Sequence, residues 1–213
     1  KPPEYNTIDL LISFKKSDTG DDLIGNIFKD GKHTKQTLTQ YKTLLLKVGY
    51  DETKHGYLNP LDNLLNGTFT RETKDERSSN YKPALFFPTN PYDTTAHICN
   101  MMLKNDVTGT PQLFSLEDEI IEDNMIVEFK YDFTKENLWR WIPIKVRYDK
   151  TTEYRNGNKN YGNAYHVANS NWKSIHHPIT PNMLCSSKPI DVEDIDDDTY
   201  YRTITGKSYT ESL

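Results

Sequence analysis

Three charged side chains within four positions form the clearest chemical pattern in the sequence. They are Arg147, Asp149 and Lys150, in the stretch RWIPIKVRYDKTTEYR at residues 140–155. A carboxylate two residues after an arginine can hold the guanidinium in place and leave other N–H donors free for a phosphate. The pattern indicates a phosphate-binding motif, and the alternative is a solvated strand face that ends in a turn.

The elements around this motif are predicted to be two antiparallel strands. Side chains alternate between the two faces of a strand, which predicts a core face and a charged face. Residues 125–132, MIVEFKYD, alternate in the same way, and FTKEN at 133–137 would join the two strands into a hairpin. The core face would carry Ile142, Ile144, Val146 and Tyr148, and the charged face Lys145, Arg147 and Asp149.

The rest of the chain reads as short strands with one helix. Apolar or β-branched runs predict strands at residues 7–14, 23–28, 40–49 and 97–103. Apolar residues at three- and four-residue spacing predict a helix over 165–175, which Asn163 would cap and Pro178 would end. Since no strand–helix–strand alternation is present, we expect a mainly β fold: a small antiparallel barrel with a C-terminal helix, or a β-rich α+β domain.

Charge is distributed unevenly along the 213 residues. The formal net charge is −5, and six acidic residues between positions 191 and 198 account for more than all of it. Because the remaining body is close to neutral, bulk electrostatic attraction to nucleic acid is not expected, and any such contact would be local.

Cysteine usage and hydropathy limit the cellular setting. Cys99 and Cys185 have no CxxC partner, so we expect neither a zinc site nor a disulfide framework, which suits a reducing compartment. No apolar run approaches the roughly 20 residues that cross a bilayer, so no membrane partner is expected. The opening KPPEYNT lacks signal-peptide character and looks like the interior of a longer polypeptide.

Three blocks, in order, resemble the C-terminal half of a covalent nucleotidyltransferase of the mRNA guanylyltransferase type. They are KPPEYNTIDLLISF at 1–14, MIVEFKYD at 125–132 and IPIKVRYDKTTEYR at 142–155. In that family a Lys-x-Lys-Pro strand and a Thr-Ile-Asp-Phe segment close the catalytic domain, and an OB-fold lid carries Arg-x-Asp-Lys. Lys1 matches the second lysine, residues 7–10 match the following segment, and Arg147, Asp149 and Lys150 match the lid motif. Residues 161–180 resemble the stretch after that motif in capping enzymes of large double-stranded DNA viruses.

The resemblance implies transfer of GMP from GTP, through a lysyl-GMP intermediate, to the 5′-diphosphate end of RNA. The lid would bring Arg147 and Lys150 to the β and γ phosphates while Asp149 orients them, and Lys1 would lie against the α phosphate. Asp9 and Lys145 would have supporting roles. The nucleophilic lysine belongs to a Lys-x-Asp-Gly motif that this chain lacks, so we expect the chain alone to be inactive. Mg²⁺ or Mn²⁺ would serve the intact enzyme, with none bound by this chain alone.

The resemblance also implies a division of the chain. Residues 1–30 would be the last strands of the nucleotidyltransferase domain, 31–184 the OB-fold lid with an insertion at about 51–82, and 185–213 an acidic linker. A catalytic domain would precede this chain and a methyltransferase module would follow it, in a multifunctional viral enzyme. The expected location is the host cytoplasm, in a viral factory, or the virion.

Two alternatives stay open at this point. One is the OB domain of an ATP-dependent polynucleotide ligase, which uses the same chemistry with adenylate. The other is a non-catalytic OB module that binds single-stranded nucleic acid on aromatic side chains. Trp139, Trp141 and Trp172 are expected to be core and edge packing residues rather than base-stacking residues.

Overall fold

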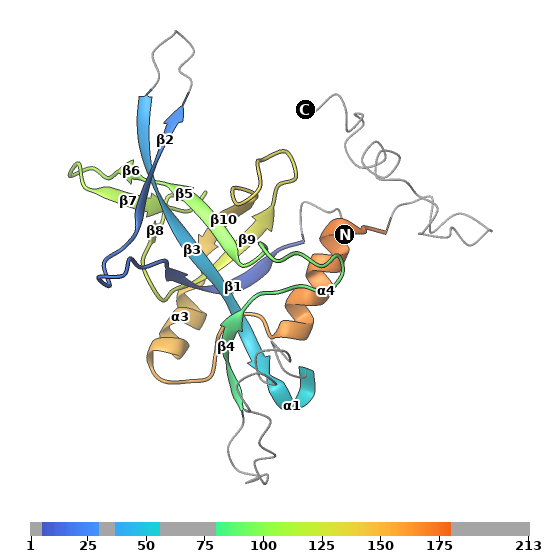
Figure 1. Ribbon diagram of the computed structural model, residues 1–213. Helices are drawn as coiled ribbons and strands as arrows, with labels where there is room; N and C mark the ends of the chain where they lie inside the picture. Colours follow the sequence, from blue (N-terminus) through green and yellow to red (C-terminus); the bar gives the residue numbers. More distant parts are fainter. Residues whose placement is uncertain (1–5, 30–36, 56–79, 180–213) are drawn as a thin grey trace. The chain divides into compact units, whose positions relative to one another are not determined.

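A single antiparallel sheet dominates the computed structural model, which describes residues 6–29, 37–55 and 80–179 (Figure 1). The strands run in the order β10–β9–β1–β3–β2, and β4 and β5 also pair with β3. They are β1 (Ile8–Phe14), β2 (Ile24–Lys29), β3 (Thr37–Asp51), β4 (Tyr81–Leu85), β5 (Ile98–Met102), β9 (Ile126–Tyr131) and β10 (Trp141–Val146). A small second sheet contains β6 (Lys104–Asn105), β7 (Pro111–Phe114) and β8 (Ile120–Ile121).

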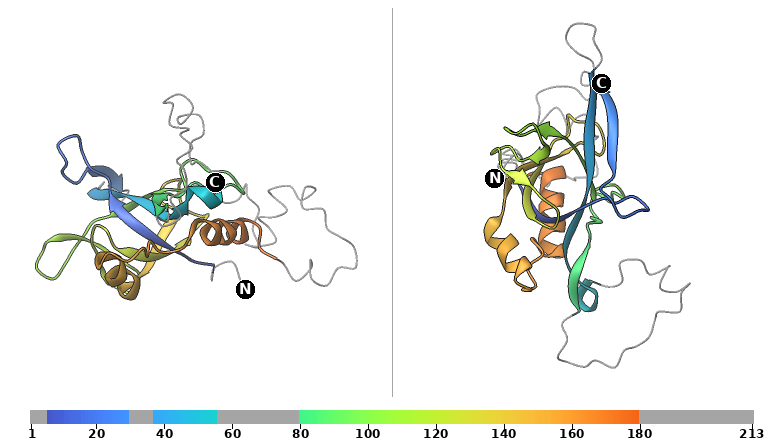
Figure 2. Two further views of the ribbon diagram at one scale, coloured as in Figure 1. Left: turned by 90° about the horizontal axis from the view of Figure 1, so that it is seen from below. Right: turned by 90° about the vertical axis from the view of Figure 1, so that its left-hand side faces the viewer.

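The described helices are α1 (Glu52–His55), α3 (Tyr148–Arg155) and α4 (Tyr165–His176). Both views of Figure 2 place α3 and α4 on the same side of the long strand β3. The helix predicted over 165–175 is confirmed as α4. None of the helices in the described ranges is long and apolar enough to cross a membrane.

The core forms where the strands β1, β3, β5, β9 and β10 meet α4. β1 is buried along nearly its whole length, and it is a central strand that pairs with β3 on one edge and with β9 on the other. Trp141 and Trp172 are buried, and each indole N–H donates to a backbone carbonyl, that of Ala96 or Pro91. The expectation that these two tryptophans pack in the core is confirmed. Trp139 is half-buried and its ring lies 5.2 Å from that of Tyr41.

The mainly β fold class is confirmed, but the expected barrel does not close. Within the described residues, β10 has a strand partner on one edge only, namely β9. On its other edge, the carbonyls of Pro143 and Ile144 accept hydrogen bonds from the backbone N–H groups of Leu116 and Glu117 in the β7–β8 turn. Pro143 itself has no N–H to donate to a further strand. A turn therefore covers the edge at which another strand would have closed the barrel.

The predicted β9–β10 hairpin is confirmed, but its second strand ends earlier than expected. A bulge between Pro143 and Lys145 shifts the alternation, so that Trp141, Pro143 and Val146 are the buried residues. The strand stops at Val146, and Tyr148, predicted to face the core, is 53% exposed at the start of α3. The charged residues of the motif therefore straddle a strand-to-helix junction.

Asn163 does not cap α4 with its side chain, contrary to expectation. Its side-chain oxygen accepts the backbone N–H of Asp9 at 2.7 Å, and its own N–H donates to the Asp9 carbonyl at 2.7 Å. Next to it, Gly162 has φ of +82° and makes an isolated bridge with Leu10. The connection between α3 and α4 is thus fastened to the backbone of β1.

Gly162→Ala is expected to lower the free energy of unfolding by about 2–4 kcal/mol. An added Cβ would lie 2.4 Å from the Asp9 carbonyl oxygen, in addition to the strain of the positive φ. Urea unfolding followed by circular dichroism measures the loss. Gly157→Ala is the matched control, because its φ is +83° and a Cβ there would meet nothing within 4 Å. Equal losses in both variants would contradict the importance of the close contact with β1.

The chain separates into two compact units, Lys1–His176 and His177–Leu213. Within the first unit, β1 and β2 belong to the same sheet as β3, β4, β5, β9 and β10. The assignment of 1–30 to a neighbouring catalytic domain stays a prediction, as do the boundaries at 31–184 and 185–213. Most of the expected insertion at 51–82 and all of the acidic segment lie outside the described residues.

Candidate functional site

The residues of the motif at 147–150 meet at a buried carboxylate on the central strand β1. Asp9 is 6% exposed. Its Oδ2 atom accepts a hydrogen bond from Arg147 Nη1 and another from Lys150 Nζ, the latter at 2.7 Å. A buried carboxylate is stable only when it is paired and hydrogen-bonded. Asp9 therefore holds both cations of the motif at one point.

Asp149 holds the Arg147 guanidinium from the other side, as its spacing predicts. Arg147 Nε and Nη2 donate to the two Asp149 oxygens at 3.3 and 3.2 Å. Burial lowers the pKa of Arg147, but the hydrogen bond with Asp149 and the charges of the nearby carboxylates raise it above its usual value overall. The pKa of Asp149 is lowered, chiefly by the hydrogen bond from Arg147. Both side chains are therefore charged near neutral pH.

The start of α3 is tied to β9, which fixes the motif in place. The backbone N–H of Arg147 donates to the Ile126 carbonyl at 2.8 Å, and the Ile126 N–H donates to Thr151 Oγ1 at 3.0 Å. Thr151 is 3% exposed. Since Arg147 and Thr151 are one helical turn apart, these two bonds anchor the first turn of α3 to the strand that pairs with β1.

A second ion pair lies beside the first. Glu128 on β9 stands directly opposite Asp9 on β1, a pairing of like charges that is unfavourable by itself. Lys145 Nζ lies 3.6 Å from Glu128 Oε2, and Thr7 Oγ1 donates to Glu128 Oε1 at 2.6 Å. Lys145 therefore neutralises Glu128, next to the Asp9 site. Lys1, the remaining residue of the predicted site, lies outside the described residues.

The motif keeps hydrogen-bonding capacity on its solvent side. Three of the five guanidinium N–H groups of Arg147 bond to Asp9 and Asp149, and Lys150 uses one of its three N–H groups on Asp9. The Arg147 and Lys150 side chains are 27% and 24% exposed. The other N–H groups can therefore reach an anion at the surface, which suits a phosphate oxygen.

The described residues contain no group of three or more His, Cys, Asp or Glu side chains arranged to hold a metal ion. Asp9 and Asp149, the carboxylates closest to the motif, already accept hydrogen bonds from Arg147 and Lys150. These residues do not fit a resident Mg²⁺ of their own.

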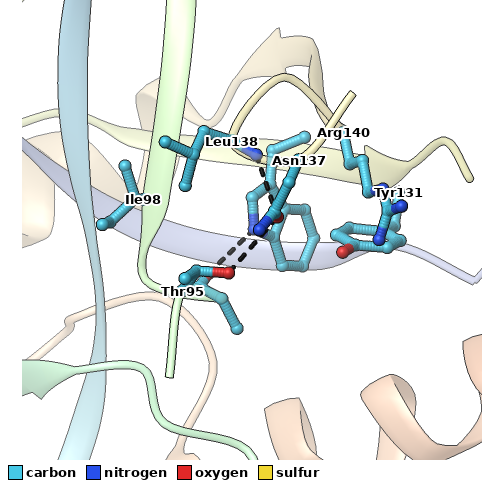
Figure 3. Close-up of a pocket in the computed structure, with 8 residues that line it drawn as sticks. Thr95, Ile98, Tyr131, Asn137, Leu138 and Arg140 are labelled. Atoms are coloured by element: carbon cyan, nitrogen blue, oxygen red, sulfur yellow. Dashed lines mark hydrogen bonds between the residues drawn. The ribbon is translucent and has the colours of Figure 1, made fainter. Parts of the chain in front are cut away.

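A small depression lies near the β9–β10 turn, and none of its lining residues belongs to the motif. Figure 3 shows Asn137 between Thr95 and Leu138, with hydrogen bonds to Asn137 Oδ1 from Thr95 Oγ1 at 3.3 Å and from Leu138 N at 3.0 Å. The space between its lining atoms is about 160 Å³ including open solvent, and almost none of it is enclosed enough to hold a water molecule. Ligand pockets are typically roughly 300–1,000 Å³, so this hollow does not compete with the motif as a functional site.

The structure gives Asp9 a larger place than the supporting one expected from the sequence. It is the only polar residue before Ser13 in the strand sequence IDLLISF. An acidic residue within a buried apolar run requires a cationic partner, and that signal was present in the sequence. Neither the identity nor the position of the partner follows from it, because both cations lie about 140 residues away.

Comparison with known proteins identifies a viral relative of this chain. The chain is 31% identical over 189 residues to a protein named probable mRNA-capping enzyme from Acanthamoeba polyphaga mimivirus. The alignment covers 87% of this chain and 13% of that relative, so the chain spans about an eighth of the relative's length. No family model matches, and no solved structure matches. The similarity confirms the resemblance carried by the three sequence blocks: the chain is related to a segment of a viral mRNA-capping enzyme.

Proposed function

We propose that this chain is the phosphate-orienting part of an mRNA guanylyltransferase. In the proposed reaction a lysine outside this chain attacks the α phosphate of GTP, pyrophosphate leaves, and GMP passes from that lysine to the 5′-diphosphate end of RNA. The observation that carries the proposal is the convergence of Arg147 and Lys150 on Asp9. The similarity to a viral capping enzyme supports the choice of reaction.

Each motif residue has a defined task in this reaction. Negative charge accumulates on the β and γ phosphates as the bond to the α phosphate breaks, and positive groups held in advance stabilise that charge. Arg147 would present two N–H groups in a fixed plane, because Asp149 and Asp9 hold the others. Lys150 would supply a second positive charge beside it. Asp9 itself would not touch the nucleotide and would act through the two cations.

Lys145 would act indirectly, through Glu128, without contacting the nucleotide. Its contact with Glu128 limits the negative potential beside Asp9, which would otherwise oppose the approach of a triphosphate. Lys1, on the segment that resembles the end of the catalytic domain, would contact the α phosphate.

The wider setting is part of the same proposal. The described unit would be an OB-type lid, with the catalytic nucleotidyltransferase domain upstream and a methyltransferase module downstream in one polypeptide. Mg²⁺ or Mn²⁺ would arrive with the nucleotide phosphates. The enzyme would act on viral mRNA in the host cytoplasm or in the virion.

The nucleotide used decides between capping and ligation. In a polypeptide that joins this chain to the upstream lysine-bearing domain, we expect a covalent label from GTP carrying a labelled α phosphate, and no label from the corresponding ATP. The measurement is the label that stays with the denatured protein in the presence of Mg²⁺. Label from ATP alone would contradict the proposal and indicate a polynucleotide ligase.

A further inference from the structure

Three tyrosine rings from separate segments lie in a row beside the candidate site. Tyr81 belongs to β4, Tyr154 to α3, and Tyr161 to the connection between α3 and α4. The ring centroid of Tyr161 lies 5.4 Å from that of Tyr81 and 5.9 Å from that of Tyr154. We call these three residues the tyrosine row.

Glycine in the neighbouring strand leaves room for the row to pack against the sheet. Tyr81 lies across Gly49 of β3, where an added Cβ would stand 1.8 Å from the tyrosine hydroxyl. The Gly49 N–H donates to the Asn163 carbonyl, which keeps the segment that carries Tyr161 next to Gly49. The row is therefore placed by backbone contacts and does not depend on the flexible ends of long side chains.

The tyrosine row lies next to the cations of the motif on α3. Tyr154 follows Lys150 by four residues on α3, so both side chains lie on the same face of that helix. Gly162 follows Tyr161 and packs against the Asp9 carbonyl. In Figure 1, α3 and the connection to α4 lie on one side of the sheet and reach β4. A single surface thus extends from the Asp9 site to β4.

The chemistry of this surface suits unpaired bases. All three tyrosines are half-buried, so their rings are held in place while part of each stays accessible. Burial, followed by the charge of nearby Tyr161, raises the pKa of Tyr81, so its phenol is neutral and adds no repulsion toward phosphates. Proteins bind single-stranded nucleic acid by combining positive groups along the backbone with aromatic faces on which the bases stack. Here Arg147 and Lys150 supply the positive groups and the tyrosine row the aromatic faces.

We propose that the tyrosine row stacks the first unpaired bases of the acceptor RNA and so leads its 5′ end to the cations at Asp9. The proposal rests on the proposed function, since the guanylyltransferase reaction supplies the RNA acceptor. It adds a binding surface for bases to the phosphate-binding motif. Stacking on a ring does not distinguish one base from another, which is what a capping enzyme needs for transcripts of different sequence.

The test is RNA binding by the full 213-residue chain. A fluorescent single-stranded oligonucleotide with a 5′-hydroxyl end reports affinity through anisotropy. Tyr154→Ala and Tyr161→Ala are each expected to raise Kd about tenfold, because stacking on one ring contributes roughly 1–3 kcal/mol per base. Tyr154→Phe and Tyr161→Phe should stay within about twofold, since the π face is kept. Tyr92→Ala, which removes a 70% exposed tyrosine outside the row, is the matched control.

Thermal unfolding of each variant shows whether it is folded. Weaker binding by a folded variant then reports the loss of the stacking surface. If Tyr161→Ala does not fold, Tyr161→Leu keeps most of the apolar volume without a π face and should show the same weaker binding. Unchanged Kd in folded alanine or leucine variants would overturn the proposal, as would equal losses in the phenylalanine variants. Because the assay contains no GTP, its outcome does not depend on guanylate labelling, and failure of base stacking can be told apart from failure of the guanylyltransferase proposal.

Discussion

Alanine in place of Arg147 or Lys150 is expected to slow covalent guanylate formation by about 10²–10³-fold, the range found when one preorganised charge-stabilising group is removed. Both cations are held by Asp9 before any nucleotide binds, so no reorganisation is needed as charge develops. The measurement is the single-turnover rate of labelling with GTP, in the polypeptide that includes the upstream lysine.

Matched variants distinguish the effect of where a positive group is placed from the effect of the chain's overall charge on labelling. Arg147→Lys keeps the charge but loses the planar fork that Asp149 holds, so most of the rate should still be lost. Arg155→Ala removes an arginine from the last turn of the same helix, and Lys173→Ala removes an exposed lysine from α4. Both controls should label at the normal rate. Normal labelling by Arg147→Ala and Lys150→Ala would make the motif a solvated charged cluster.

The sequence alone predicts the elements whose structure depends on a local residue pattern. The alternation of residues 125–132 and the short FTKEN connection predict the β9–β10 hairpin, and the spacing of apolar residues predicts α4. The contact between Arg147 and Asp149 also follows from spacing alone, because only one residue separates them. Each of these features depends on residues close together in the chain.

The features that the sequence did not reveal depend on distant segments. The bulge at Pro143 changes which residues of β10 are buried, and the β7–β8 turn, nearly 30 residues earlier, occupies the edge of that strand. Asn163 is a reasonable helix cap by local pattern, yet the backbone of Asp9 takes its side-chain oxygen. For Asn163 a long-range hydrogen bond outweighs the local preference.

The place of β1 also bears on how a lid would move. Asp9 lies in the segment that resembles the end of the catalytic domain, whereas Arg147 and Lys150 lie in the lid motif. In the structure β1 pairs with β3 and β9 in one sheet, so these residues belong to one compact unit. A swinging lid would carry Asp9 with it, and opening would leave the ion pairs intact. The cations would reach the nucleotide already in position.

Asp9→Ala is expected to lower the free energy of unfolding by about 2–4 kcal/mol, because removing one partner of a buried ion pair leaves the others without compensation. Arg147 and Lys150 both lose their shared acceptor, although each is about a quarter exposed and can turn toward water. That exposure places the expected loss below the upper end for fully buried pairs. Urea unfolding of the full chain gives the value.

Asp149→Ala is the matched control, since it removes the other carboxylate that binds Arg147. The Asp149 side chain is 63% exposed, and ion pairs with exposed partners contribute about 0–1 kcal/mol. Each variant therefore removes one carboxylate that binds Arg147. The Asp9 carboxylate is buried and the Asp149 carboxylate is exposed. A loss in Asp149→Ala as large as that in Asp9→Ala would mean that the cation pair is held from the surface, and the central role of Asp9 would be wrong. A large loss confined to Asp9→Ala would make the strand β1 the element that positions both cations.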